Sequence, residues 1–205
     1  MAIRDLLWAC PFCRAEDAIR TEGRGEVCKR CGARFRRGAG AEIEARPVGG
    51  QPVRRHAAEW AAELPPVRLP DETEAGPDER EYRRTAAVAR FVVGLAPVHA
   101  RGRYLGRVER LGPAVQGTLV LTSRALTFAP GEGQAHRWPL EAVAAVQPSS
   151  SGLQLRMRGG PVVLFRFPDA SVRLWEETIQ AALRRLYRRA GWGEIVEFQP
   201  RISVR

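Results

Sequence analysis

Hydrophobic and polar residues alternate over short stretches in the second half of the chain. Residues 153–158 read Leu-Gln-Leu-Arg-Met-Arg, a pattern that is typical of a strand with one buried face. Two apolar stretches, 118–122 and 125–128, are separated by Ser123-Arg124 alone, which predicts a hairpin. Gly159-Gly160 then turns the chain into a further apolar run at 162–167, and shorter runs at 136–140 and 142–146 predict two edge strands. We therefore expect a set of short antiparallel strands.

Helical spacing of apolar residues predicts three helices. The last begins at Asp169 or Ser171, runs to about Arg189, and carries an apolar stripe that includes Trp175. A second helix is predicted over 79–95: Asp78 precedes it, Glu81 lies three residues further on in a capping-box arrangement, and apolar residues recur as far as Leu95. We expect it to pack on the following domain; an amphipathic membrane helix is the alternative. A short helix at 53–64 would present Trp60, either to the main domain or to a partner.

These elements divide the chain into five parts. Residues 1–38 hold the cysteines, and 39–78 are rich in Gly, Pro and charge, which indicates a mobile linker interrupted by the short helix at 53–64. Residues 79–95 form the connecting helix and 96–190 the main domain. The tail, 191–205, contains Glu194-Ile-Val-Glu-Phe198, which reads as an edge strand or a docking peptide.

All four cysteines of the chain lie in two matched pairs. Cys10 and Cys13, then Cys28 and Cys31, each enclose two residues, and fourteen residues separate the pairs. Two such knuckles can meet to give a tetrahedral site of four sulfurs, which suits Zn(II) or, less often, iron. Because four thiolates leave no position open for water, the zinc is expected to be structural. A redox dithiol and a chance cluster are the alternatives, and neither requires two matched pairs.

The cysteine segment resembles a zinc ribbon. The resemblance implies a small metal-stabilised module that binds protein, braces a neighbouring domain or contacts nucleic acid. Nucleic-acid contact would use basic side chains such as Lys29, Arg30 and Arg34, which nearby acidic residues nearly balance.

Charge and composition narrow the range of partners. The net charge is +10, and residues 95–190 hold 14 basic against 6 acidic groups, so the excess lies in the main domain. All basic residues except Lys29 are arginine, a bias that suggests a GC-rich, bacterial genome. No apolar run is long enough to span a bilayer, and the first residues lack the pattern of a signal peptide. Paired Cys-x-x-Cys motifs suit a reducing compartment, so we expect a cytoplasmic location, with peripheral membrane association as an option.

The main domain resembles the GRAM and pleckstrin-homology-like superfamily. The resemblance covers about residues 98–190 and depends on three features in order: the hairpin Gly117-Thr-Leu-Val-Leu-Thr-Ser-Arg-Ala-Leu-Thr-Phe128, the segment Trp138-Pro-Leu-Glu-Ala-Val143, and the closing helix with Trp175. It implies a mainly β, α+β fold: a small barrel or bent antiparallel sheet capped by a C-terminal helix.

The same resemblance implies a binding module for an anionic lipid headgroup or a protein partner. Its members meet lipid with basic residues on the early strands and their connecting loop. In this chain the corresponding residues are Arg101, Arg103, Arg107 and Arg110, whose guanidinium groups can hold phosphate in two-pronged hydrogen bonds. An ordinary solvated surface is the alternative interpretation.

No residue pattern indicates an enzyme. His56, His99 and His136 lie far apart, zinc would take every thiol, and no glycine-rich loop with a lysine is present. We therefore expect a non-enzymatic adaptor in which a zinc ribbon is tethered to a GRAM or pleckstrin-homology-like module. The alternative is a nucleic-acid-associated protein in which basic residues contact the phosphate backbone.

Overall fold

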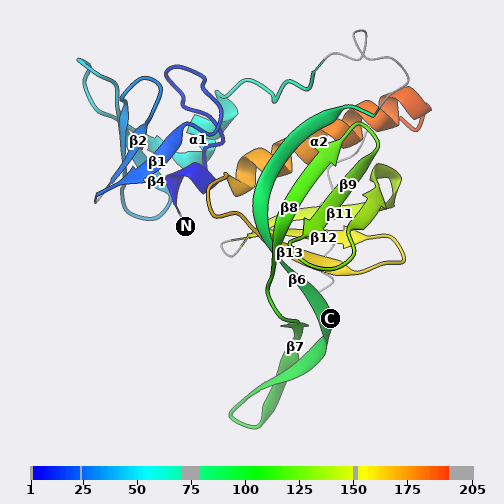
Figure 1. The fold of residues 1–205 in the computed structure, drawn as a ribbon. Helices are drawn as coiled ribbons and strands as arrows, with labels where there is room; N and C mark the ends of the chain where they lie inside the picture. Colours follow the sequence, from blue (N-terminus) through cyan, green and yellow to red (C-terminus); the bar gives the residue numbers. More distant parts are fainter. Residues whose placement is uncertain (1, 24, 71–78, 150–151, 194–205) are drawn as a thin grey trace.

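Two antiparallel sheets and one long helix make up the protein, whose computed structural model describes residues 2–23, 25–70, 79–149 and 152–193. The smaller sheet belongs to the N-terminal cysteine module. The larger sheet and the long helix form the C-terminal domain, and the helix lies along the inner side of that sheet (Figure 1).

The N-terminal module is a five-stranded meander in which each strand pairs with the next along the chain. Alternate residues such as Phe35 and Ile43 point into a core that also contains Cys10 and Cys28. A short 3-10 turn precedes the sheet and a short helix follows it. The elements are η1 (Ile3–Asp5), β1 (Ile19–Glu22), β2 (Gly25–Cys28), β3 (Arg34–Arg37), β4 (Glu42–Arg46), β5 (Val53–His56) and α1 (Ala57–Ala62).

The first part of the segment expected to be a mobile linker is folded. Strand β4 pairs with β3, and β5 pairs with β4, so both extend the cysteine module. The short helix predicted over 53–64 is present only as α1, since Val53–His56 form β5. Trp60 packs on this module and not on the main domain, and its Nε1 donates to the Ile43 carbonyl at 3.2 Å. These strands could not be predicted from composition, because each is short and is stabilised by pairing with a neighbouring strand rather than by its own apolar residues.

The larger sheet has eight strands. Seven follow the order β10-β9-β8-β6-β13-β12-β11, and β7 pairs with β6 alone. The end strands of this order, β10 and β11, do not pair with each other, so the sheet over the described residues is bent but not a closed barrel. Its elements are β6 (Glu81–Ala100), β7 (Arg103–Leu111), β8 (Val115–Thr122), β9 (Ala125–Pro130), β10 (His136–Pro139), η3 (Leu140–Ala142), β11 (Val143–Ser149), β12 (Gly152–Met157), β13 (Val162–Arg166) and the helix α2 (Val172–Ala190).

The helix predicted over 79–95 is wrong, because these residues begin the long strand β6. Ala87 and Ala89 are 2% and 0% exposed and alternate with less buried neighbours, as expected for a strand. Alanine favours helices in isolation. Here, however, β8 and β13 pair with opposite edges of β6 through backbone hydrogen bonds. Tertiary pairing therefore overrides local preference, and the C-terminal sheet begins at Glu81.

Other predicted elements of the C-terminal domain are confirmed. The hairpin across Ser123-Arg124 is β8–β9, the alternating segment is β12, and the run after Gly159-Gly160 is β13. Ser171 is the N-cap of α2, since its hydroxyl accepts from the Leu174 amide at 3.2 Å. The buried face of α2 packs in the core of the bent sheet, where the Trp175 ring stacks on Phe167 at 5.4 Å.

The first turn of α2 joins the two parts of the protein. Leu174 is fully buried and belongs to the core of the cysteine module, although it lies on the C-terminal helix. The Ser171 amide donates to Asp17 Oδ1 at 3.1 Å, and the Ser171 hydroxyl donates to the Arg4 carbonyl. Arg83 on β6 forms an ion pair with Glu16 at 2.9 Å. Side chains and backbone from both parts therefore form one packed junction.

None of the helices in the described ranges is both long and apolar enough to cross a membrane.

Glu176 provides a test of the packing of α2. Burial raises the pKa of its carboxyl above the ordinary value of 4.5, although Arg173 lies 2.6 Å away and acts in the opposite direction. The folded state therefore binds the proton more tightly than the unfolded state, and ionised Glu176 destabilises the fold. We expect Glu176→Gln to raise the free energy of unfolding near neutral pH, measured by urea denaturation. The gain should disappear below pH 4.5, where the carboxyl is protonated in both states.

The matched control is Glu177→Gln, because Glu177 also pairs with Arg173 but is more exposed. An equal gain from both variants would contradict the role assigned to burial of Glu176.

Candidate metal centre

The four cysteine sulfurs converge at one point. Their Sγ atoms all lie within 4.8 Å of one another, with Cys10 to Cys31 at 3.7 Å and Cys13 to Cys28 at 3.6 Å. A tetrahedral ion with Zn–S bonds of about 2.3 Å places its sulfurs about 3.8 Å apart. Both of these contacts join a cysteine of the first pair to one of the second, so the two pairs share a common centre. This arrangement identifies a candidate metal site.

The two knuckles have matching backbone geometry. In the first, the Arg14 amide donates to the Cys10 carbonyl at 2.8 Å; in the second, Gly32 donates to Cys28 at the same distance. The amide of each leading cysteine also donates to the residue five positions later, Ala15 or Ala33. Both Arg14 and Gly32 have positive φ, 62° and 75°. A left-handed residue after each second cysteine therefore closes both knuckles.

The surroundings control ionisation of the thiols. Burial raises the pKa of Cys10 and of Cys31 above the ordinary thiol value. Burial opposes ionisation of Cys28 as well, but hydrogen bonds from the amides of Cys31 and Arg30, together with those from the neighbouring thiols, outweigh it and lower the pKa of Cys28. The buried sulfurs repel one another when charged, so a cation at their centre would be required to hold all four as thiolates.

Aromatic and aliphatic side chains enclose the cysteine cluster. The Phe12 ring lies 6.3 Å from that of Phe35 and 5.9 Å edge-on to that of Trp60. Cys10 and Cys28 are buried and the other two are half-buried. Four sulfurs from two turns, covered by these rings, can hold an ion in a complete shell, which suits a structural role rather than catalysis.

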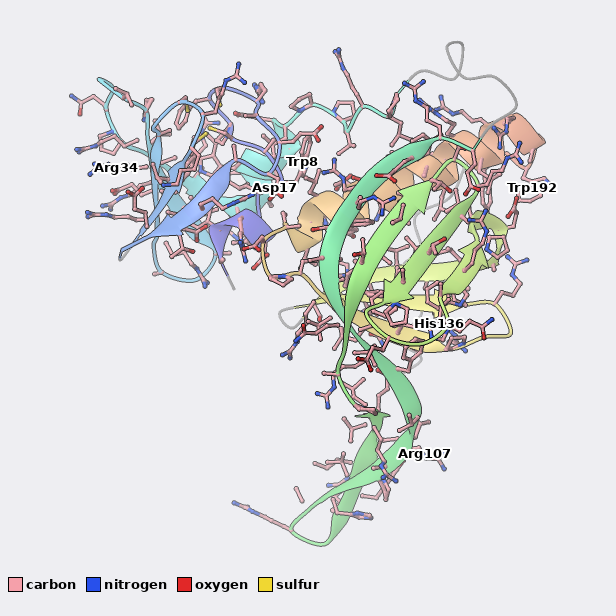
Figure 2. The ribbon with its side chains drawn as sticks, viewed as in Figure 1. Trp8, Asp17, Arg34, Arg107, His136 and Trp192 are labelled. Carbon is pink, nitrogen blue, oxygen red and sulfur yellow. The ribbon has the colours of Figure 1, made fainter. Side chains whose placement is uncertain are left out.

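The structure places the four predicted anion-binding arginines on the β6–β7 hairpin, defined as residues 92–111. This hairpin projects from the larger sheet, with Arg107 on its shaft (Figure 2). Arg101 lies in the turn at its tip, while Arg103, Arg107 and Arg110 lie on β7. All four are exposed, and within the described part of the chain none of their side chains has an ion-pair or hydrogen-bond partner. The four arginines predicted from the sequence therefore lie on the same hairpin.

The exposed apolar side chains of the same hairpin were not predicted from the sequence. Among the described residues, eight large hydrophobic side chains are exposed, and six of them lie here: Val93, Leu95, Val98, Tyr104, Leu105 and Val108. The alternation of residues 103–110 could have indicated a strand, but the helix predicted for 79–95 hid its partner. Exposed arginines and exposed apolar side chains therefore lie together on this hairpin.

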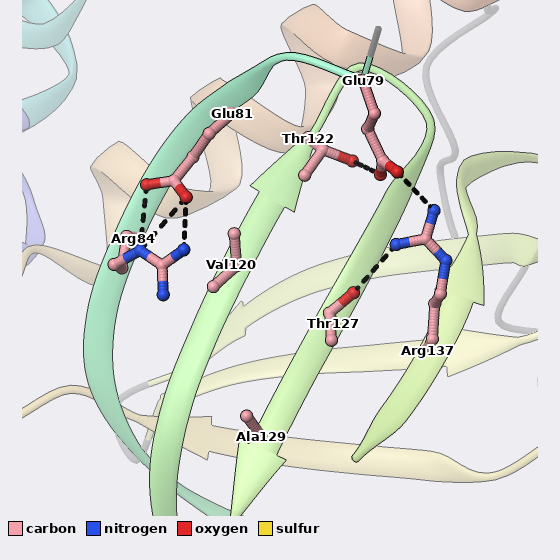
Figure 3. A pocket seen from close by; sticks show the side chains of 8 residues that line it. All are labelled: Glu79, Glu81, Arg84, Val120, Thr122, Thr127, Ala129 and Arg137. Carbon is pink, nitrogen blue, oxygen red and sulfur yellow. Dashed lines mark hydrogen bonds and ion pairs between the residues drawn. The ribbon is translucent and has the colours of Figure 1, made fainter.

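A pocket on the outer face of the larger sheet is a weaker candidate site. Glu79 pairs there with Arg137 at 2.7 Å and accepts from the Thr122 hydroxyl, while Glu81 pairs with Arg84 (Figure 3). The hydrogen bond from Arg137 holds the pKa of Glu79 below its ordinary value. Because these charges satisfy one another within the pocket, they do not call for a ligand.

Gly32 tests the backbone geometry of the second knuckle. Its φ is +75°, and an added Cβ would lie 3.1 Å from Val48 Cγ2. We expect Gly32→Ala to lower the free energy of unfolding by about 1–2 kcal/mol, measured by chemical denaturation, because alanine disfavours this conformation. Arg14→Gly at the equivalent position relieves the positive φ but removes the hydrogen bond from the Arg14 guanidinium to the Glu63 carbonyl, so it should cost less stability than Gly32→Ala. A loss from Arg14→Gly as large as that from Gly32→Ala would contradict the equivalence of the knuckles.

Comparison with known proteins gives no information on the cysteine cluster. No family model matches the chain, and no curated protein is found to match it. The case for a metal centre therefore depends on the spacing of the cysteines, the distances between their sulfurs and the two equivalent knuckles.

Proposed function

We propose that the cysteine cluster binds one structural Zn(II) ion and that residues 1–62 form an extended zinc ribbon. Support comes from the sulfur–sulfur distances of 3.6 and 3.7 Å, close to the edges of a tetrahedral zinc–thiolate site. The module is small and its core contains two of the ligands, Cys10 and Cys28. Metal binding would therefore supply much of its folding free energy, on the order of 10 kcal/mol.

Zinc removal tests this proposal. We expect about one zinc per chain by elemental analysis, and a marked fall in melting temperature when a strong chelator removes it. Cys28→Ser should lose the metal, whereas Gly94→Ala, in the hairpin and with open space around the added methyl group, should retain it. A chain that contains no zinc after expression with zinc, yet folds normally, would contradict the assignment.

We further propose that the C-terminal domain is a GRAM or pleckstrin-homology-like module. The order β10-β9-β8-β6-β13-β12-β11, with α2 packed in the bend, supports a bent antiparallel sheet closed at one end by a helix. The hairpin β8–β9 and the helix with Trp175 are two of the features that carry the resemblance in the sequence.

The function that this architecture supports best is that of a non-enzymatic adaptor. The zinc ribbon would brace the C-terminal domain through the junction at Ser171 and Leu174, and the β6–β7 hairpin would bind an anionic surface on a protein or a membrane. One observation carries this proposal: four exposed arginines, whose side chains have no partner among the described residues, share a projecting hairpin with six exposed apolar residues. Guanidinium groups bind carboxylate and phosphate in two-pronged hydrogen bonds.

Loss of charge on the hairpin tests the adaptor proposal. We expect the variant Arg101→Gln/Arg103→Gln/Arg107→Gln to lose most binding to acidic ligands, measured by co-sedimentation with anionic liposomes and by anisotropy with a labelled acidic peptide. The control is Arg156→Gln/Arg158→Gln, which removes two exposed arginines from β12 and the turn after it. Equal binding by all three proteins, or no binding to either ligand at low salt, would contradict the proposal.

A nucleic-acid role is the second candidate, and one pairing favours it. Arg34 and Arg46 lie directly opposite each other on β3 and β4, and both are exposed. Like charges in this position destabilise a sheet, which suggests that an anion offsets them. Binding of duplex DNA that falls with Arg34→Gln/Arg46→Gln, but not with the hairpin variant, would favour this role over the adaptor.

A further inference from the structure

The β6–β7 hairpin is a two-stranded ribbon with an open edge. Beyond Val92, β6 pairs with β7, and β7 has no second partner strand among the described residues. A two-stranded ribbon alone is only marginally stable in water, whereas a third strand increases stability. The outer edge of β7 therefore presents backbone amides and carbonyls to which an extended chain can be added.

The base of this ribbon is fixed to the larger sheet. The Gly112 amide donates to the Phe91 carbonyl at 2.8 Å, and Arg90 Nε donates to the Gly112 carbonyl at 2.9 Å. Gln154 on β12 donates to Glu109 at 2.7 Å. These contacts hold the base of the ribbon in place. Part of the entropy cost of ordering the ribbon when a strand is added is therefore already offset in the free protein.

Exposed apolar side chains lie on both faces of the ribbon. The register places Ala96 opposite Val108, and the adjacent pair, Leu95 and Glu109, points to the other face. Val108 and Leu95 are 52% and 57% exposed. Side chains of an added strand would alternate between the same two faces, so one strand would contact both apolar sets.

The charge of β7 restricts which strand can be added. β7 carries three basic residues, Arg103, Arg107 and Arg110, and one acidic residue, Glu109. The Glu109 carboxylate already accepts a hydrogen bond from Gln154. Pairing of β7 with its copy in a second molecule would bring these arginines together, which disfavours self-association. A strand with glutamate or aspartate side chains would instead gain from each arginine.

A bilayer suits the same surface less well. An open strand edge cannot enter hydrocarbon without leaving backbone groups unsatisfied. A ribbon lying flat on a membrane would bury one face and leave the other in water, although both carry exposed apolar residues. At the tip, where insertion would begin, Arg101 and Arg103 flank Gly102.

We propose that the outer edge of β7 binds an extended, acidic segment of a partner protein as an additional β-strand. This proposal rests on the adaptor function proposed above. Backbone hydrogen bonds along 103–108 hold the segment, and its apolar side chains pack beside Val108 and Leu105. Its carboxylates pair with the arginines of β7.

The test uses the zinc-loaded full chain and a labelled ten-residue peptide that alternates glutamate with valine or threonine. We expect saturable binding, and slower hydrogen exchange of β7 amides within 103–108 when the peptide is present. A peptide with the same sequence but four N-methylated central amides keeps every charge and cannot form the strand ladder. It should bind at least about tenfold more weakly.

A second comparison tests the role of charge in peptide binding. It compares the variant Arg103→Gln/Arg107→Gln with the control Arg156→Gln/Arg158→Gln. Equal affinity for the methylated and unmethylated peptides, with dependence on the hairpin arginines, would overturn strand addition and retain an anion-binding hairpin. Binding to anionic liposomes but not to the peptide would overturn strand addition in favour of a membrane surface. Binding to neither would overturn both this inference and the adaptor function.

Discussion

The packed junction at the first turn of α2 is the contact on which the arrangement of the whole protein depends. Asp17 follows the first cysteine knuckle and accepts a hydrogen bond from the amide of Ser171, the residue that caps α2. Leu174, one turn later, completes the core of the cysteine module. The helix that fills the bent sheet is thus held at its start by residues whose positions depend on the cysteine cluster. Order at the sulfurs and order in the C-terminal core are physically connected.

Features with a local signature could be predicted from the sequence. The spacing of Cys10, Cys13, Cys28 and Cys31 is enough to bring four sulfurs together, because each knuckle is a short turn whose geometry depends on its own residues. The strands between 115 and 166 alternate or are bounded by turn residues, and α2 has an N-cap and an apolar stripe. In each case the signal lies within a few neighbouring residues.

Features that depend on distant partners could not be predicted. β6 contains Ala87 and Ala89, which suit a helix until β8 and β13 cover both edges of the strand. β4 and β5 lie in a segment whose composition resembles a linker, and only pairing with β3 makes them part of a sheet. The exposed apolar side chains of the hairpin escaped notice for the same reason: assigning 79–95 to a helix removed the strand that pairs with β7.

The length of β6 also determines the order in which the chain can fold during synthesis. One edge of this strand is covered by β7 and β8, which follow it closely along the chain, so hairpins can form on that side early. The other edge pairs with β13, where Phe91 meets Val163, and α2 is made later still. A nascent chain therefore exposes an unpaired strand edge until β13 has left the ribosome, and an unfilled apolar core until α2 has followed it. The strands of the cysteine module pair only with their sequence neighbours and can form long before that point, although Leu174 joins the core of the module only when α2 has been made.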